Sequence, residues 1–384
     1  MFHLNKDKKI LLISGWYTPE IGGYVKIVHE LAIKLSEFGY RIDILTSNYS
    51  NKIETEKINN ITIYRIPSWR IINNNYPIPK IGFKNCFFII KLIKSRYHCV
   101  ITNTRFVPIC FYGLFFTFLS GIPFIHIEHG SCHPISDNWL VSIIGRIFDH
   151  TLGSILIQCA KKNIGVSYSA ANFLSHLGSK NPIVIHNSLD FTIFKNIEHD
   201  NRNFADNKLI ISYVGRLIYG KGVQDLIKIF PQLNGNVKML IVGDGPYKKN
   251  LEELAKNVEI MNINFLGEII PEEIPNIFSI SDIIVNPSYS EGLPTSVIEA
   301  CAAGCAVVAT NVGGTNEIIQ NEINGFLYLP KDHEKLIEIL NVLILDVELR
   351  KRIGNNAKNY VINNFSWDTA INKWISLIEN IRKF

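Results

Sequence analysis

The sequence predicts an α/β protein built from two doubly wound domains, each with a parallel sheet between helices. The chain has 384 residues, enough for two or three domains that each bury a core. Short β-branched runs alternate with longer segments of helical period, a pattern typical of parallel sheets covered by helices. The alternation stops in the polar segment Phe191 to Asn207, which we interpret as the linker between the domains.

The predicted strands form one set on each side of this linker. The front set is Lys9 to Ser14, Arg41 to Thr46, Ile61 to Ile66, Cys99 to Thr102, Phe124 to Ile127, Asn163 to Ser167 and Ile183 to Ile185, with helices such as Tyr24 to Phe38 and Asn138 to Gln158 between them. The back set is Leu209 to Val214, Lys238 to Val242, Ile263 to Leu266, Ile283 to Asn286, Ala306 to Ala309 and Gly325 to Tyr328. We therefore expect domains at 1–190 and 191–364 that face each other across a cleft, and a closing helix at 365–384.

Composition is that of an ordinary globular protein. Hydrophobic residues make up 47% and charged residues 19% of the chain, which excludes a disordered chain. The seven cysteines include no CxxC pair, so we expect buried, reduced thiols in a reducing compartment and neither a zinc site nor a disulfide scaffold.

One apolar stretch, Phe106 to Ile127, carries no charged side chain and is long enough to cross a bilayer. Prolines and a glycine divide it, so we expect a buried helix over Pro108 to Leu119 and a buried strand over Pro123 to Ile127. The polar amino terminus, Met1 to Lys9, does not resemble a signal peptide.

Charge is divided unevenly along the chain. The formal net charge is +5, with +9 on residues 1–190 and −4 on the rest, so we expect the front domain to face an anionic partner. Within it, the stretch Phe83 to Arg96 sets Lys and Arg beside Phe and Ile. This pattern is typical of a helix lying on anionic lipid, or of a helix that covers a sheet and exposes its lysines.

The most informative stretch is Pro287 to Glu317. Glu291 and Glu299 lie eight positions apart, the first in a loop after a strand and the second in a helix that begins near Pro294 or Thr295. Backbone N–H groups at such a helix start can meet an anion or a ring of hydroxyls. Carboxylates on both sides can accept hydrogen bonds from the vicinal diols of sugar and ribose, although two glutamates at this spacing are more often solvated charges.

A second cluster opens the back domain in the run GRLIYGKG. Arg216 and Lys221 lie on a loop that follows a strand and ends at Gly222. Two cations on such a loop can clamp a diphosphate, and the alternative is a pair of solvated charges. The run is not a Walker P-loop.

Two features of the front domain follow its strands. Gly22 and Gly23 precede a helix and allow close approach of a ligand to the backbone, although a Gly-Gly pair more often marks a turn. His129 follows a strand in the run IEHG, where it would contact substrate or serve as a hydrogen-bonded structural histidine.

Together these motifs resemble the retaining glycosyltransferases of the GT-B fold, specifically family 4, the glycosyl transferases group 1. The resemblance covers most of the chain and depends on the order of its motifs. These are Gly22-Gly23, Glu30-Leu31-Ala32, His129-Gly130, NSLD at Asn187 to Asp190, GRLxxxKG at Gly215 to Gly222, VGDGP at Val242 to Pro246, and the E-x7-E element of Glu291 and Glu299. It implies two Rossmann-like domains and a tail helix that returns to the N-terminal domain.

The resemblance also implies roles for individual residues. The donor-binding residues would be Gly22, Gly23, Arg216, Lys221, Gly292, Leu293, Pro294, Thr295 and Glu299, and the catalytic residues His129 and Glu291. Arg216 and Lys221 would hold the donor diphosphate and Glu299 the ribose hydroxyls. His129, and Glu291 with the amides that follow it, would contact the donor sugar, and the segment Gly267 to Glu272 would border the base.

The sequence departs from the family pattern in two places. The common EGFGLP is EGLPTSVIEA here, so the identity of the donor sugar does not carry over, and Ser188 stands where a glycine is usual. No D-x-D pair is present, so we expect no metal ion and no cofactor besides the nucleotide-sugar substrate.

We therefore expect a cytoplasmic enzyme on the inner face of the cytoplasmic membrane, held there by its basic N-terminal domain. It would move a sugar from a nucleotide donor to a polyprenyl-diphosphate-linked saccharide of a surface polysaccharide, such as lipopolysaccharide O-antigen or capsule, without a nucleic-acid partner. The alternatives are a sugar-nucleotide 2-epimerase on a similar fold, a non-catalytic nucleotide-sugar-binding subunit, and a dinucleotide-dependent oxidoreductase, although no GxGxxG follows the first strand.

Overall fold

The computed structural model describes residues 8–20, 22–50, 52–71, 76–194, 197, 208–257 and 262–382. Contacts divide the chain into two units. The N-unit comprises Met1–His133, Ile143–Ser188 and Trp367–Phe384, and the C-unit comprises Pro134–Ser142 and Leu189–Ser366. Residues 195–196 and 198–207 of the expected linker lie outside the described residues.

The N-unit is built around one large sheet of order β3-β4-β2-β1-β6-β7-β8-β9, with β5 paired to β4. Its strands are β1 (Lys9–Ile13), β2 (Arg41–Asn48), β3 (Glu54–Ile58), β4 (Ile61–Ile71), β5 (Tyr76–Pro79), β6 (Cys99–Asn103), β7 (Phe124–Glu128), β8 (Lys162–Gly165) and β9 (Ile183–Val184). The seven strands predicted for the front half are confirmed and pair in parallel. Strands β3 and β5 were not predicted, and both pair antiparallel with β4.

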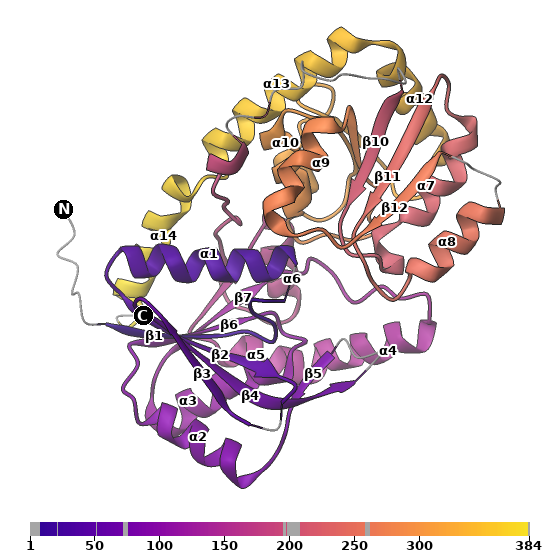
Figure 1. The fold of residues 1–384 in the computed structure, drawn as a ribbon. Coiled ribbons are helices and arrows are strands. Elements are labelled where there is room, and N and C mark those ends of the chain that lie inside the picture. Colours follow the sequence, from indigo (N-terminus) through magenta and orange to yellow (C-terminus); the bar gives the residue numbers. More distant parts are fainter. Residues whose placement is uncertain are drawn as a thin grey trace. The chain divides into compact units, whose positions relative to one another are not determined.

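Helices cover both faces of this sheet, as Figure 1 shows for α1 (Gly23–Glu37) on one face and α2 (Phe83–Ile93) and α3 (Tyr112–Ser120) on the other. Helix α1 buries apolar residues at helical spacing, including Val28, Leu31 and Leu35. The last helix, α14 (Trp367–Asn380), packs against α1, and Trp367 Nε1 donates a hydrogen bond of 2.7 Å to Glu30 Oε2. The tail of the chain therefore completes the N-unit.

The apolar stretch Phe106 to Ile127 forms a helix and a strand, as predicted. A short 3₁₀ turn, η1 (Pro108–Phe111), leads into α3, and β7 follows within the sheet. The expectation of a buried helix is wrong for one face of α3, because Phe115 is 50% and Phe118 73% exposed. Helix α3 packs on β6 and β7, and its buried residues are Gly113 and Phe116, so the opposite face lies outside the core.

A second apolar stretch, Trp139–Cys159, lies where a helix was predicted over Asn138 to Gln158. It consists of α4 (Trp139–Phe148), the π-helical turn η2 (Asp149–Gly153) and α5 (Ser154–Cys159). Within the described part of the chain it is, by length and composition, the one helical stretch that is long and apolar enough to span a bilayer, and 22% of its apolar 18-residue window is buried.

The C-unit has a fully parallel sheet of order β12-β11-β10-β13-β14-β15. Its strands are β10 (Leu209–Val214), β11 (Val237–Val242), β12 (Ile263–Gly267), β13 (Ile283–Asn286), β14 (Ala306–Thr310) and β15 (Phe326–Tyr328), which confirms all six predicted for this half. Its main helices are α7 (Val223–Ile229), α8 (Lys248–Asn257), α9 (Ile274–Ile280), α10 (Thr295–Ala303), α11 (Thr315–Ile318), α12 (His333–Leu345) and α13 (Val347–Asn364). The prediction of two doubly wound domains is therefore confirmed.

All seven cysteines lie among the described residues, and all are free thiols. Cys99, Cys110, Cys301 and Cys305 are buried, and Cys86 is exposed. Burial raises the pKa of the Cys99 and Cys110 thiols to about 12, so both stay protonated at neutral pH. The expectation of buried thiols is confirmed for the four buried cysteines and wrong for Cys86, while Cys132 and Cys159 are half-buried.

Candidate active site

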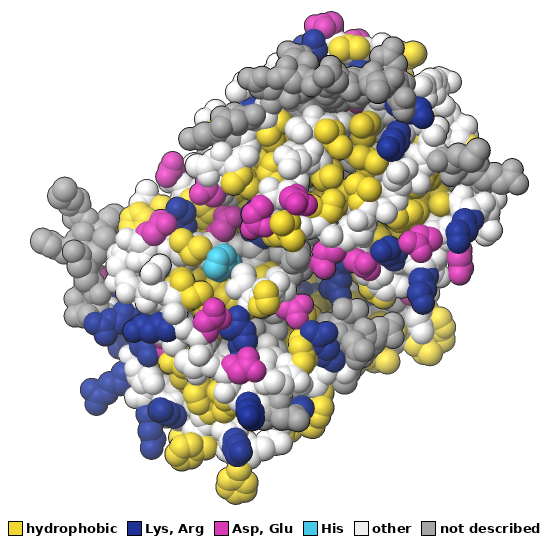
Figure 2. Space-filling model, viewed as in Figure 1, with side chains coloured by type: hydrophobic (Ala, Val, Ile, Leu, Met, Phe, Trp, Pro, Cys, Tyr) yellow, Lys and Arg dark blue, Asp and Glu magenta, His cyan; other side chains and the backbone are white. Residues whose placement is uncertain are grey.

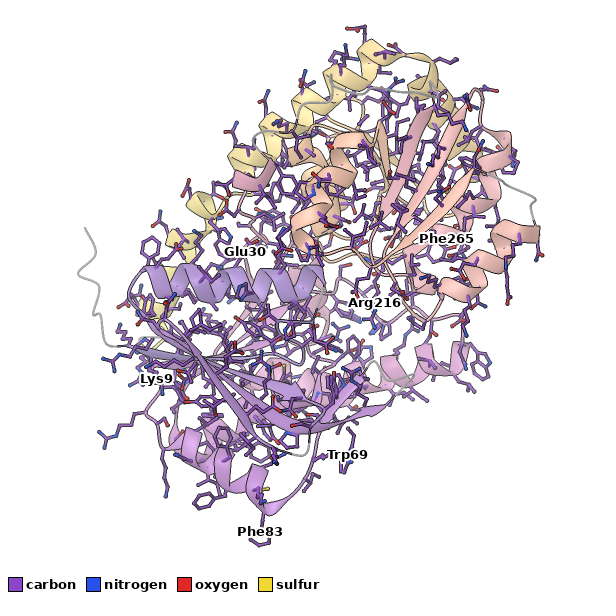
Figure 3. The ribbon with its side chains drawn as sticks, in the orientation of Figure 1. Lys9, Glu30, Trp69, Phe83, Arg216 and Phe265 are labelled. Carbon is purple, nitrogen blue, oxygen red and sulfur yellow. The ribbon has the colours of Figure 1, made fainter. Side chains whose placement is uncertain are left out.

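The strand order places the C-unit candidates where a doubly wound sheet binds its ligands. From β10 the chain continues outward through β11 and β12, then returns to place β13 on the other side of β10. Ligands in such sheets bind beyond the carboxyl ends of the strands on either side of this reversal. Arg216 and Lys221 follow β10, and Glu291 follows β13, so the two candidate loops flank this point. Figure 3 labels Arg216 at this end of the sheet.

The loop that carries Arg216 is hydrogen-bonded to the loop after β11 and packs closely against it. Leu217 N–H donates to the Asp244 carbonyl oxygen at 2.9 Å. A Cβ on Gly243 would lie 1.9 Å from the Gly215 carbonyl oxygen, and one on Gly245 would lie 2.3 Å from that of Leu217. The glycines of VGDGP therefore let two loops cross in contact, which holds the exposed Arg216 side chain at the strand end.

Lys221 and Glu291 form an ion pair across the reversal of the sheet. Lys221 Nζ lies 2.7 Å from Glu291 Oε1, with 26% of the lysine side chain and 8% of the glutamate side chain exposed. The loop can pass here because Gly222 has a φ of 68°, and a Cβ there would lie 1.9 Å from the Pro287 carbonyl oxygen. The structure thus brings together two residues that are 70 positions apart in the chain.

Two further polar residues hold the Glu291 carboxylate. Ser288 Oγ donates to Oε1 at 2.6 Å, and Asn286 Nδ2 donates to the same oxygen at 3.4 Å. Both are buried. Neither residue was predicted from the sequence to belong to the site. Asn286 is the last residue of β13, a position where polar residues often contribute to binding sites.

Glu299 and the residues from Gly292 to Thr295 belong to the start of α10. The helix begins at Thr295 after Pro294, as predicted. Gly292, Leu293, Pro294 and Glu299 are buried, and Thr295 is half-buried. The Gly292 carbonyl oxygen accepts a 2.9 Å hydrogen bond from Gly314 N–H. The segment is therefore fixed on one side by the loop after β14, beside Glu291.

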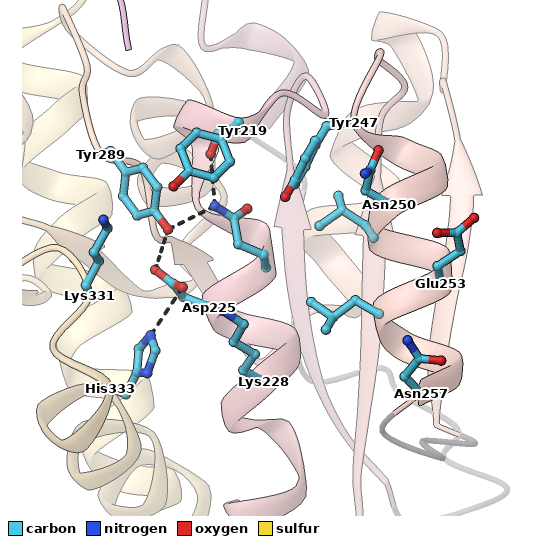
Figure 4. A pocket seen from close by; sticks show the side chains of 13 residues that line it. Tyr219, Asp225, Lys228, Tyr247, Asn250, Glu253, Asn257, Tyr289, Lys331 and His333 are labelled. Carbon is cyan, nitrogen blue, oxygen red and sulfur yellow. Dashed lines mark hydrogen bonds and ion pairs between the residues drawn. The ribbon is translucent and has the colours of Figure 1, made fainter. Parts of the chain in front are cut away.

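Behind these loops lies a cavity of about 460 Å³ between α7 and α8. Tyr219 and Tyr289, one from each candidate loop, line it with their rings in contact at 5.5 Å between centroids. Gln224 Nε2 donates to the Tyr289 hydroxyl at 2.9 Å, and that hydroxyl donates to Asp225 Oδ2 at 2.8 Å (Figure 4). None of the predicted donor-binding residues lines this cavity. We therefore interpret the hydrogen bonds of Gln224 and Asp225 with Tyr289 as contacts that stabilise the two candidate loops.

The N-unit candidates lie at the corresponding reversal of their own sheet, between β1 and β6. Gly22 and Gly23 are both exposed at the start of α1, and nothing lies within 4 Å of a Cβ placed on Gly22. Tyr24 connects them with His129, because the Tyr24 and His129 rings meet edge to face at 5.0 Å. The structure therefore brings Gly22, Gly23 and His129 to one region of the N-unit.

His129 is held as a neutral imidazole. Burial lowers its pKa to about 4, with the neighbouring Glu128 acting in the opposite direction. Its Nε2 lies 3.4 Å from Asn103 Oδ1, at the end of β6. At neutral pH this histidine can donate or accept a hydrogen bond, but it carries no charge.

A buried ionic network includes Glu128, the residue before His129. Arg105 contacts Glu128 Oε1 at 2.7 Å through one guanidinium nitrogen and Asp149 Oδ1 at 2.6 Å through Nε. All three side chains are fully buried. Burial alone would raise the pKa of Glu128, but Arg105 and His126 hold it well below its usual range. Arg105 and Asp149 were not predicted from the sequence, because they are 44 positions apart and belong to no common motif.

Sequence comparisons find two family profiles that together cover most of the chain. The family described as Glycosyl transferases group 1 matches residues 194–360, and Glycosyltransferase Family 4 matches residues 21–192. An uncharacterized glycosyltransferase of Methanocaldococcus jannaschii is 31% identical, over 97% of this chain and 98% of its own length. A capsular polysaccharide biosynthesis glycosyltransferase of Staphylococcus aureus is 28% identical, over 56% of this chain and 61% of its own length.

Solved structures have the same fold. The Anabaena protein HepE in complex with UDP-glucose matches with a TM-score of 0.77 and 19% identity, covering 97% of this chain and 99% of HepE. At this identity the likeness concerns the fold.

Proposed function

Because the chain belongs to the family 4 glycosyltransferases, the glycosyl transferases group 1, we propose that it transfers a sugar from a nucleotide sugar to a lipid-linked saccharide with retention of configuration. Its fold is GT-B, with two Rossmann-like units. The observation that carries the proposal is the Lys221–Glu291 ion pair between the loops that flank the reversal of the C-unit sheet.

The charges at this point suit a nucleotide diphosphate. Arg216 offers a planar fork of donors and Lys221 a compact charge with three donors. Lys221 can therefore keep its contact with Glu291 and bind a diphosphate oxygen as well. Glu291 accepts hydrogen bonds from Lys221, Ser288 and Asn286 on Oε1, and a carboxylate held in this way is an acceptor of the kind that binds sugar hydroxyls.

The proposed reaction breaks the bond between the anomeric carbon and the diphosphate oxygen. The acceptor hydroxyl attacks on the same face, and a donor phosphate oxygen takes its proton. Arg216, Lys221 and backbone amides at the start of α10 would balance the charge that develops on the diphosphate, so we propose that the reaction needs no metal ion. Neutral His129 would contribute a hydrogen bond to the sugar and no charge.

The donor is proposed to be a nucleotide sugar because of the fold and the diphosphate clamp. HepE, which shares the fold, has been solved with UDP-glucose. A surface polysaccharide as the acceptor is supported by the capsular polysaccharide relative.

The lipid-linked acceptor is supported by the surface of α2. Phe83, Phe87 and Ile90 lie on one helical face and are 98%, 73% and 47% exposed, while Ile89 and Leu92 on the other face are buried. Figure 3 shows Phe83 pointing away from the body of the N-unit. The helix thus covers the sheet, as one interpretation of its sequence predicts. It also presents aromatic side chains outward, which supports the proposal that this face lies on lipid.

Basic side chains surround this apolar face. Lys84, Lys91, Lys94 and Arg96 are exposed, and from residue 57 to residue 127 the chain contains Lys and Arg but no Asp or Glu. Figure 2 shows dark-blue basic and yellow apolar side chains beside one another in the region where Figure 1 places α2. Aromatic residues with basic neighbours suit an anionic membrane surface. We therefore propose peripheral attachment of a cytoplasmic enzyme to the inner face of the membrane.

The experiment that tests this function has two stages. Thermal shifts with UDP, GDP and ADP sugars identify the donor, since a ligand that binds only the folded protein raises its melting temperature. The donor is then incubated with a polyprenyl-diphosphate-linked saccharide in vesicles. We expect a product with the anomeric configuration of the donor, read by NMR.

Two results would contradict the proposal and identify its rivals. An epimerised nucleotide sugar formed without acceptor would indicate a 2-epimerase. Donor binding without transfer to any acceptor of a broad panel would indicate a non-catalytic binding subunit.

A further inference from the structure

Three histidines that play no part in the proposed transfer converge on the N-unit. His133 follows β7, His150 lies in the π-helical turn η2, and His176 is the last residue of α6 (Tyr168–His176). One ring nitrogen from each lies within 4.8 Å of the others. Three separate elements therefore bring their imidazoles to one place.

The local fold explains how His150 reaches this cluster. A π-helical turn has wider hydrogen bonding than an α-helix, and such turns occur often at functional sites. Here η2 separates α4 from α5, with Asp149 fully buried and its neighbour His150 exposed. The turn thus directs adjacent side chains to the interior and to the histidine cluster.

His133 is held in place by a carboxylate. Its Nδ1 lies 2.6 Å from Asp149 Oδ2, and Asp149 is itself fixed by Arg105. Histidines that ligate metals usually donate their other ring N–H to a carboxylate, which sets the tautomer and the ring orientation. With Nδ1 directed at Asp149, Nε2 is the nitrogen of His133 that can face a metal ion.

We propose that His133, His150 and His176 bind a divalent transition-metal ion, with Zn²⁺ as the best fit. Three imidazoles and a water molecule form a known tetrahedral zinc set, with Zn–N distances of about 2.0–2.1 Å. Neighbouring ligand nitrogens then lie about 3.3 Å apart by tetrahedral geometry. The ring nitrogens lie within 4.8 Å of one another, and His150 and His176 are exposed. Small rotations of these two side chains can therefore bring the nitrogens to the shorter spacing of a zinc site.

This site is separate from the proposed diphosphate clamp, since it shares no residue with Arg216, Lys221 or Glu291. The sequence led us to expect no metal ion and no zinc site, because it has no D-x-D pair and no CxxC pair. Neither of those patterns includes the three histidines, which come together only in the fold. The bound ion would instead tie the segment after β7 to η2 and α6. Through Asp149, Arg105 and Glu128 it would stabilise the backbone that carries His129, which is a positioning role.

The test uses full-length protein without a histidine tag, stripped with a chelator. Titration calorimetry with ZnCl₂ should show one equivalent bound, and Zn²⁺ should raise the melting temperature. His150→Ala and His176→Ala should each weaken binding at least tenfold, and the double variant should abolish it. Both side chains are exposed, so the folded state should survive. His186→Ala, a half-buried histidine outside the cluster, should bind Zn²⁺ as the wild type does.

Cobalt gives a second readout of the ligand geometry. The Co²⁺-loaded wild type should show the visible absorption of a tetrahedral ion, and the double variant should lack it. Absence of saturable Zn²⁺ binding by the wild type would overturn the proposal, as would binding that the double variant retains. Neither measurement depends on transfer activity, so this proposal fails or stands independently of the proposed function.

Discussion

Individual side chains in the two units differ in how they are charged. Lys221 and Glu291 form a partly exposed ion pair, whereas His129 is kept neutral by burial. The C-unit residues are thus suited to holding an anion, and the N-unit residue is suited to an uncharged hydrogen bond. The proposed roles of these residues, a diphosphate clamp for the ion pair and a hydrogen bond to the sugar for His129, agree with this difference in charge.

The low pKa of His129 predicts a contribution to acid instability. The folded pKa of about 4 lies below the ordinary value, so the unfolded chain takes up this proton first as the pH falls. The free energy of unfolding should therefore decrease as the pH falls through the interval from about 6.5 to about 4. Replacing His129 by Gln should reduce the loss of stability between pH 7 and pH 5 by about 1–2 kcal/mol.

Urea denaturation of the wild type and of His129→Gln at both pH values measures this difference. The pKa of Glu128 is also held low, so its contribution to the free energy of unfolding falls as the pH falls. Glu128 is present in both proteins, so this contribution cancels in the comparison. Equal pH dependence of the two proteins would show that His129 is not held neutral in the folded state.

Among the elements, the loop after β10 depends on a backbone conformation that only glycine adopts easily. Gly222 and Gly235 both have positive φ angles, of 68° and 82°. A Cβ on Gly222 would lie 1.9 Å from a carbonyl oxygen, whereas one on Gly235 would lie 3.4 Å from a flexible Ile344 methyl group. Alanine at Gly235 would therefore test the left-handed backbone conformation alone, whereas alanine at Gly222 would add a steric overlap.

We expect Gly235→Ala to cost about 1–2 kcal/mol for the left-handed conformation. Gly222→Ala should cost about 1–3 kcal/mol more, because the loop must also move away from Pro287. It should also reduce sugar transfer, since Lys221 is the preceding residue. Denaturant midpoints and transfer rates of both variants test this, and equal effects would show that the crossing tolerates a side chain.

The exposed face of α2 predicts membrane binding. Full burial of a Phe side chain is worth about 1.5–3 kcal/mol, so Phe83→Ser with Phe87→Ser should weaken binding to anionic vesicles at least tenfold. Leu329→Ser with Leu345→Ser is the matched control, since these C-unit leucines are 63% and 75% exposed. Vesicle co-sedimentation measures both, and equal loss in the control, or none in the α2 variant, would rule out this surface.

On the scale of the whole molecule, the tail helix belongs energetically to the N-unit. Ile378 is fully buried and lies in α14, which packs on α1. Ile378→Ala should cost about 2–5 kcal/mol and should speed amide hydrogen exchange in α1 while leaving the C-unit sheet unchanged. Ile362→Ala on α13, at a position that is 38% exposed, is the control. Faster exchange throughout both units would mean that they unfold as one.

The sequence predicted the two sheets well because their parallel strands are short, apolar and separated by long helices. It failed for β3, whose five residues are all exposed, and for β5, whose four residues include two prolines. Neither has the apolar alternation of a strand that packs on a core. Both are held by pairing with β4, which local sequence does not reveal.

Within the candidate site, the sequence indicated residues that belong to recognisable motifs, and it did not indicate the residues that contact them in the structure. Ser288 and Asn286 contact Glu291 only after the loop folds back. Arg105 and Asp149 are 44 positions apart and meet through tertiary packing. Motif spacing can select candidate ligand-binding residues, but it does not identify the buried groups that orient them.

The most direct test of the central claim is sugar transfer by variants of the ion pair at the reversal of the C-unit sheet. Loss of one charge-stabilising donor typically costs about 10²–10³ in rate, so Lys221→Ala and Glu291→Gln should each slow transfer about a hundredfold or more. Lys249→Ala, an exposed lysine on α8, should transfer at the wild-type rate. If Lys221→Ala and Glu291→Gln fold normally and also transfer at the wild-type rate, these residues do not hold the donor and the site lies elsewhere.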